Sequence, residues 1–237
     1  MHGNAPPDAP LPVAAPAPAP APISRVQQNL VARAERVVLN WICQRLPMWV
    51  RPDMLTAVGM VGALMVFAGY VASALDHAWL WLAIVGYVVN WFGDSTDGSL
   101  ARYRQIERPR YGYFLDHSCD GIATTLVVAG IGISPFVHLE VALVALAGYL
   151  LMSIHAFLSV KVSGELRLSY MAAGPTELRI ILIVFTLAML TFGEDPDAIL
   201  GYDLFAGFAG AVLIGLFLAQ TFATARRLAA EEPPRSR

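Results

Sequence analysis

Charged side chains are scarce in this chain of 237 residues, since Asp, Glu, Lys and Arg together make up 14% of it while apolar residues make up 57%. A soluble domain normally carries about 25% charged residues. Part of the protein surface is therefore expected to face the lipid of a membrane instead of water. A basic excess is also missing, because the formal net charge is -2. Nucleic-acid binding normally depends on a basic surface that releases counterions, so we expect no nucleic-acid partner.

Cysteine is almost absent, with only Cys43 and Cys119. A disulfide framework is therefore not expected, and both residues are interpreted as small hydrophobic side chains. A secretory signal is missing too, because residues 1–22 are almost entirely Pro and Ala, without a cationic start followed by an apolar run. This composition predicts a disordered arm resembling polyproline.

Residues 23–46 alternate between apolar and basic side chains, with Leu30, Val37 and Trp41 set among Arg33 and Arg36. The pattern predicts an amphipathic helix lying in the membrane interface. A helix packed on the rest of the protein on the soluble side is the alternative.

Six long apolar stretches follow, at residues 54–75, 78–97, 113–136, 139–160, 178–192 and 204–223. Most approach the roughly 20 residues that cross about 30 Å of hydrocarbon. The fifth is shorter, and its helix is expected to open at Pro175, where a missing amide hydrogen is tolerated. The sequence therefore predicts an all-α protein with one transmembrane domain of six helices at 47–225 and a polar tail at 226–237.

The basic residues fix the expected orientation. All 16 Lys and Arg residues fall within 23–51, 102–110, 161–179 and 226–237, whereas the alternate loops contain acids and no Lys or Arg. Cytoplasmic loops carry the excess of basic residues in membrane proteins. Both termini are therefore predicted to face the cytoplasm.

Four aspartates stand at the inner ends of the second and third stretches, and they are Asp94, Asp97, Asp116 and Asp120. At 1.5 Å rise per residue, Asp94 and Asp120 lie about 24 and 25 Å from the outer ends of their helices. Spacings of three and four put each pair on one face of its helix. In two antiparallel neighbours the four carboxylates can therefore converge at one depth.

Convergent carboxylates in or near a membrane require a cation between them, because they repel one another and are costly to bury. Oxygen ligands suit hard ions such as Mg²⁺, Mn²⁺ or Ca²⁺, whereas zinc or copper would favour Cys or His. Two such ions about 3.5–4 Å apart can assist displacement at phosphorus. The alternative is a solvated helix end whose acids pair with Arg102, Arg104, Arg108 and Arg110.

The order of Asp94, Asp97-Gly98, Ala101-Arg102, Gly112, Asp116 and Asp120 resembles the signature of the CDP-alcohol phosphotransferases. That signature is D-x2-D-G-x2-A-R followed, after a spacer, by G-x3-D-x3-D, and every fixed position is filled here. The six spans and the preceding helix are similar to the family as well, so the resemblance covers roughly residues 23–225. The run Pro52-Asp53-Met54-Leu55-Thr56 is similar to the family's Pro-Asn-x-x-Thr, with Asp in place of Asn.

The resemblance implies that the four aspartates hold two divalent cations, Mg²⁺ or Mn²⁺, and that Asp120 is the catalytic base. It implies that Gly98, Ala101 and Gly112 leave room for the nucleotide of a CDP-linked donor and that Arg102 contacts phosphate. It also implies a homodimer, a membrane lipid as one substrate and a role in phospholipid synthesis.

His117 lies between two of these aspartates. The run Asp116-His117-Ser118-Cys119-Asp120 is similar to the D-H-G-C-D of choline and ethanolamine phosphotransferases, in which the histidine is proposed to assist deprotonation of diacylglycerol. Those enzymes carry a Glu four residues before it, whereas this chain has Tyr113. His117 is therefore a candidate catalytic residue, with a supporting hydrogen-bonding role as the alternative.

Two pairs of substrates stay open, namely CDP-diacylglycerol with a polar alcohol and a CDP-amino-alcohol with diacylglycerol. A cation transporter or channel is the rival from another class, but it predicts polar residues across the whole membrane, and 78–89 and 122–133 contain almost none. A catalytically inactive scaffold is the third possibility, which the intact signature disfavours.

Overall fold

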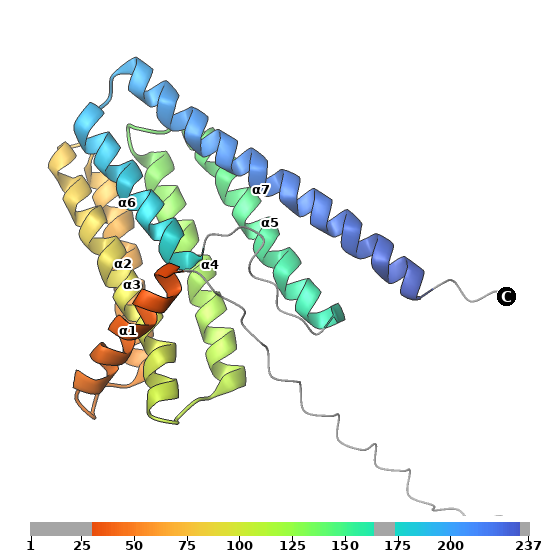
Figure 1. The fold of residues 1–237 in the computed structure, drawn as a ribbon. Helices are drawn as coiled ribbons and strands as arrows, with labels where there is room; N and C mark the ends of the chain where they lie inside the picture. Colours follow the sequence, from red (N-terminus) through yellow and green to blue (C-terminus); the bar gives the residue numbers. More distant parts are fainter. Residues whose placement is uncertain (1–29, 164–173, 233–237) are drawn as a thin grey trace, which may run out of the picture.

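The computed structural model describes residues 30–163 and 174–232, and every regular element within them is a helix (Figure 1). The all-α prediction is confirmed for this part of the chain. The predicted arm at 1–22 and residues 23–29 lie outside the described residues. In chain order the elements are α1 (Leu30–Arg45), α2 (Pro52–Ala72), η1 (His77–Trp79), α3 (Leu80–Tyr103), α4 (Pro109–Ile133), α5 (Leu139–Ser163), α6 (Pro175–Phe192) and α7 (Pro196–Glu231).

The long helices coincide with the six predicted apolar stretches, and α7 is longer than expected because it begins at Pro196 and continues to Glu231. Among the described residues, four helices are long and apolar enough to cross a membrane, namely Pro52–Ala72, Leu139–Val162, Pro175–Phe192 and Pro196–Glu231. The other two are α3 and α4. The C-terminal half of α3 and the N-terminal half of α4 carry the four aspartates of the predicted site, which lowers the apolar character of both helices.

Proline sets the start of four of the long helices, at Pro52, Pro109, Pro175 and Pro196. The first amides of a helix have no partner within it, so proline is tolerated there and its fixed φ favours helix entry. Glu177 caps the start of α6, because its carboxylate accepts a hydrogen bond from the Gly174 amide at 2.9 Å. The start at Pro175 predicted from the sequence is thus confirmed.

Helix α2 is the centre of the packing, because it lies against both α3 and α4. Small residues allow its close approach to α3. A Cβ added to Gly86 would stand 2.7 Å from the backbone nitrogen of Val66, and one added to Gly69 would stand 2.5 Å from that of Ala83. Close approach between α3 and α4 themselves is slight within the described residues. The predicted antiparallel neighbours are therefore held mainly through α2.

Three hydroxyl groups connect α2, α3 and α6 inside the apolar core. The Tyr70 hydroxyl lies 2.6 Å from Oγ1 of Thr186 and 3.2 Å from the hydroxyl of Tyr87, and all three residues are buried. Buried hydroxyl groups need such partners, because leaving them unpaired costs about 1–3 kcal/mol each. The cluster therefore favours one alignment of these three helices.

Helices α5 and α7 form a second layer that crosses the bundle and diverges from it toward one end (Figure 1). Their backbones also approach at glycine, because a Cβ at Gly148 would stand 2.9 Å from the carbonyl oxygen of Gly210. The turns after α2, α4 and α6 gather at the opposite end.

Two histidine–carboxylate pairs connect these turns. Nε2 of His77 lies 2.6 Å from Oε1 of Glu194, and Nδ1 of His138 lies 2.6 Å from Oδ2 of Asp203. The hydrogen bond to Asp203 raises the pKa of His138, because it stabilises the charged imidazolium form. The pairs thereby link η1 to the α6–α7 turn and the α4–α5 loop to α7.

Replacing Gly86 with Ala should destabilise the bundle by about 1–3 kcal/mol, because the added methyl group has no room between α2 and α3. The Gly215→Ala variant is the matched control, since nothing lies within 4 Å of a Cβ at that position. Thermal unfolding in lipid nanodiscs measures the difference. Equal melting temperatures for the two variants would contradict the close helix contact.

Candidate active site

A small cavity is lined by residues of α2, α3 and α4. Its lining residues are Thr56, Gly59, Met60, Asn90, Asp94, Cys119, Asp120 and Ala123. Asp94 and Asp120, predicted to converge from two helices, thus share one cavity. Cys119, interpreted from the sequence as a small hydrophobic side chain, lies here as well.

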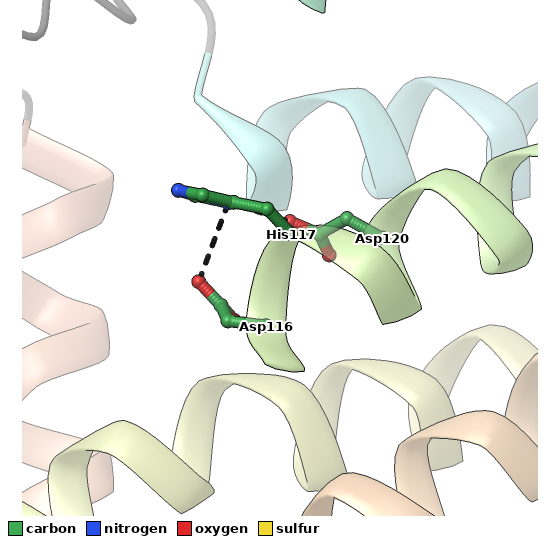
Figure 2. A group of neighbouring side chains, drawn as sticks. All are labelled: Asp116, His117 and Asp120. Carbon is green, nitrogen blue, oxygen red and sulfur yellow. Dashed lines mark ion pairs between the residues drawn. The ribbon is translucent and has the colours of Figure 1, made fainter. Parts of the chain in front are cut away.

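Three potential ligands lie together on α4. Asp116, His117 and Asp120 each offer an atom within 4.8 Å of the others, and Figure 2 shows their side chains on neighbouring turns of the helix. Nδ1 of His117 is 3.6 Å from Oδ2 of Asp116 and 3.8 Å from Oδ2 of Asp120. These separations are longer than hydrogen bonds, so the contacts are electrostatic.

The His117 ring is held by aromatic neighbours. Its centroid lies 4.3 Å from that of Tyr113, in an edge-on arrangement, and 5.1 Å from that of Phe157 on α5. Its Nε2 is buried and has no hydrogen-bond partner among the described residues. Tyr113, at the position where choline and ethanolamine phosphotransferases were noted above to carry Glu, thus packs on the histidine through its ring.

Asp94 faces a cation from α6. Nη2 of Arg179 donates to Oδ2 of Asp94 at 2.5 Å, and Nε of the same guanidinium donates to Oδ1 of Asn90 at 3.0 Å. Both charged side chains are mostly buried, with 14% of Arg179 and 24% of Asp94 exposed. Asp94 is also near enough to Asp116 and Asp120 for their charges to interact. Arg179 therefore neutralises part of a clustered negative charge.

Asp97 is held from α2 and from its own helix. Oγ1 of Thr56 donates to its Oδ2 at 2.5 Å, and the amide of Gly98 donates to its Oδ1. Its charge interacts with those of Asp94 and Asp116. The structure thus brings all four aspartates into one electrostatic cluster, but the closest ligand group on α4 includes neither Asp94 nor Asp97.

Two of the four arginines considered as ordinary partners for these acids are engaged elsewhere. Arg104 donates to backbone carbonyls of the α1–α2 connection, at 2.5 Å to Val50 and 3.0 Å to Leu46. Arg108 donates to both carboxylate oxygens of Asp53, at 2.5 and 2.7 Å, and this hydrogen bond raises the pKa of Arg108. Arg104 and Arg108 are therefore engaged away from the four aspartates.

The predicted nucleotide contacts lie on either side of the α3–α4 loop. A Cβ added to Gly112 would meet no atom within 4 Å, and one added to Gly98 would first meet the Arg102 guanidinium at 3.4 Å. Arg102 is exposed, and its Nη2 donates to the hydroxyl of Ser99 at 3.3 Å. Ala101 is half-buried on the same helix.

Three further residues contact the aspartates of α3 or each other, although none was a predicted site residue. They are Thr56, Asn90 and Arg179. Asn90 does carry a sequence signal, because it is polar within an apolar stretch and lies four residues before Asp94, on the same helix face. Thr56 stands in the Pro52–Thr56 run noted above, and Arg179 was considered only as one of the available cations. No local spacing connects either of them to an aspartate on α3.

Comparison with known proteins gives related sequences. The chain is 27% identical over 197 residues to cholinephosphotransferase 1 of Danio rerio, covering 79% of this chain and 51% of that protein. It is 30% identical over 109 residues to the protein of the same name from Xenopus laevis, covering 44% and 27% of the two chains. The chain thus spans about half the length, or less, of these curated relatives.

A sequence model of one family, CDP-alcohol phosphatidyltransferase, matches residues 49–222. The match includes α2 to α6 and most of α7, together with every residue of the cavity. Helix α1 lies outside it, so the matched region is shorter than the 23–225 expected from the resemblance. The four aspartates, the glycines between them and the helices that bring them together all fall within the match, and the chain belongs to the CDP-alcohol phosphatidyltransferase family.

Proposed function

We propose that this protein is a membrane enzyme that transfers a substituted phosphate group from a CDP-linked donor to an alcohol, releasing CMP, in phospholipid biosynthesis. The observation that carries the proposal is the cavity at which Asp94 of α3 and Asp120 of α4 meet over α2. Family membership and the cholinephosphotransferase relatives support this activity. A transporter is disfavoured because the outer part of α3 is buried in the apolar core, with Leu80, Ala83 and Tyr87 enclosed.

Asp94, Asp97, Asp116 and Asp120 are proposed to hold two divalent cations, Mg²⁺ or Mn²⁺. The donor set fits hard ions because it is rich in carboxylate oxygen. The convergence of ligand atoms on α4 and the mutual interaction of the four charges support the same assignment. When bound, such ions would offset negative charge on the donor's pyrophosphate and on the departing CMP.

Side chains at the site are proposed to accept the proton that the acceptor hydroxyl group loses in the reaction. The acceptor oxygen forms a bond to the donor phosphorus nearest the transferred group as the bond from that phosphorus to CMP breaks. Asp120, with 42% of its side chain exposed, is the proposed acceptor of the hydroxyl proton. His117 is proposed to assist, because its Nδ1 lies 3.8 Å from Oδ2 of Asp120.

The nucleotide is proposed to lie along the backbone at Gly98, Ala101 and Gly112. The open space beside Gly112 supports this, since no atom occupies the position of a Cβ there. Arg102 is proposed to contact phosphate, because an exposed guanidinium presents several donors in one plane.

A CDP-amino-alcohol donor with diacylglycerol is the substrate pair that we propose to test first. The cholinephosphotransferase relatives and the Asp116-His117 sequence support it. CDP-diacylglycerol with a polar alcohol is the second pair. A phosphorylated alcohol would need free cations near the site, and Arg179 and Arg108 are already paired with Asp94 and Asp53.

The proposed membrane arrangement has six spans, α2 to α7, in one catalytic domain at 47–225, with α1 in the cytoplasmic interface and both termini in the cytoplasm. Exposed Val37, Val38 and Trp41 on α1 support contact with lipid. The gathering of alternate turns at opposite ends of the bundle supports the up-and-down order (Figure 1). A homodimer is proposed from the family resemblance alone.

The purified protein should release CMP from CDP-choline or CDP-ethanolamine with diacylglycerol when Mg²⁺ or Mn²⁺ is present. Chelation with EDTA should abolish the release and renewed metal should restore it, because the carboxylates then regain their shared cations. Chromatographic detection of CMP and of the lipid product measures this. Absence of metal-dependent CMP release with these pairs and with CDP-diacylglycerol plus polar alcohols would overturn the proposal.

Replacing Asp120 with Asn should lower the rate of CMP release by about 10²–10⁴-fold, because the amide neither accepts the proton nor contributes a negative ligand. The Asp197→Asn variant is the matched control, since Asp197 is an exposed aspartate at the start of α7. Steady-state rates and a melting curve of both variants are compared. A rate near wild type for Asp120→Asn would exclude Asp120 as the base.

Orientation is testable with single-cysteine variants in which Cys43 and Cys119 are replaced by Ala. A membrane-impermeant maleimide should label Glu194→Cys from outside intact cells, because the α6–α7 turn faces away from the cytoplasm. Glu231→Cys should be labelled only after permeabilisation, because α7 ends in the cytoplasm. The reverse pattern would show the opposite orientation.

A further inference from the structure

Helix α1 packs on the bundle through one face. Leu39 and Cys43 are buried, with 6% and 2% of their surface exposed, and they lie four residues apart. Glu35 precedes Leu39 by four residues and so lies on the same face. Val37 and Trp41 are exposed. A carboxylate thus sits at one end of an otherwise apolar contact face.

One oxygen of Glu35 accepts three hydrogen bonds. Nε1 of Trp91 donates to Oε1 at 2.8 Å and Oγ of Ser95 at 3.1 Å, both from α3. Oγ1 of Thr176, in the first turn of α6, donates to the same oxygen at 2.7 Å. Hydrogen bonds to an ionised acceptor are stronger than neutral ones. Glu35 therefore connects three helices at a single point.

This connection lies beside the ion pair of the candidate active site. Ser95 follows Asp94 directly, and Thr176 precedes Arg179 by three residues, about one helical turn. The two helices that Glu35 joins are thus the two that carry Asp94 and Arg179. An error in the register of α6 on α3 would move the guanidinium away from both Asp94 and Asn90.

We propose that Glu35 is a positioning residue, which aligns α6 on α3 so that Arg179 meets Asp94 and Asn90. Helix α1 is then part of the catalytic structure as well as a contact to the membrane. The family match begins at residue 49, so this role belongs to a segment outside the matched region. The effect on catalysis rests on the proposed function, whereas the effect on helix alignment does not.

The first test measures alignment without activity. Hydrogen exchange of the backbone amides at 178–183 is followed in nanodiscs for wild type, Glu35→Ala and Glu35→Gln. Exchange should be at least about tenfold faster in Glu35→Ala, because α6 loses its connection to α3. Glu35→Gln should stay near wild type, since its amide oxygen still accepts hydrogen bonds. Unchanged exchange in Glu35→Ala would overturn the proposal.

The second test separates positioning from anchoring of α1, using Thr176→Val and Leu39→Ala. Thr176→Val leaves α1 intact but removes the bond to α6, and Leu39→Ala loosens α1 but keeps all three bonds. Thr176→Val should lower kcat for CMP release about fivefold or more with little change in KM. Its effect should be non-additive with Glu35→Ala, because both act on one connection.

Leu39→Ala is expected to speed maleimide labelling of Cys43, followed by peptide mass spectrometry, with a smaller loss of kcat than Thr176→Val. A normal kcat in Thr176→Val, or additive losses in the double variant, would overturn the positioning role. If the wild-type protein released no CMP, the proposed function would be overturned. The hydrogen-exchange experiment would still decide whether Glu35 aligns α6 on α3.

Discussion

The structure depends on the close approach of α2 to its neighbours. Gly69 and Gly86 let the backbones of α2 and α3 lie within van der Waals distance, and Gly130 brings α4 to α2, where an added Cβ would be 3.0 Å from Cα of Phe67. Because α2 contacts both helices while they scarcely contact each other, the space between α3 and α4 is left for side chains. The cavity with Asp94 and Asp120 lies in that space.

The four aspartates of the site have different partners, and these partners determine how freely each side chain can move. Asp97 is fixed by the hydroxyl of Thr56 and the amide of Gly98, and Asp94 by Arg179. Asp116 and Asp120 share the neighbourhood of His117 at longer, electrostatic distances. The two aspartates of α3 are therefore fixed by hydrogen bonds from α2, from α6 and from their own helix.

Much of this arrangement follows from local sequence. The apolar stretches and their prolines predict the helices, and spacings of three and four predict which acids share a face. The partners of those acids are different, because Arg179 is separated from Asp94 by 85 residues of chain and meets it only through the packing of α6 on α3. Likewise, the sequence alone indicates only that Glu35 is one of several polar residues of an amphipathic helix. Its three hydrogen-bond donors lie on α3 and α6 and are identified only by the structure. Long-range pairing depends on where backbones can approach, and spacing within one helix carries no information about that.

The guanidinium of Arg179 gives the site a permanent counterion. A cluster of acids that relied on dissolved ions alone would be least stable whenever those ions became scarce, since repulsion among carboxylates is strong in a medium of low polarity. Here one of the opposing charges is part of the polypeptide. The contact between α3 and α6 can therefore persist without any dissolved cation, and a protein stripped of bound ions should keep its fold.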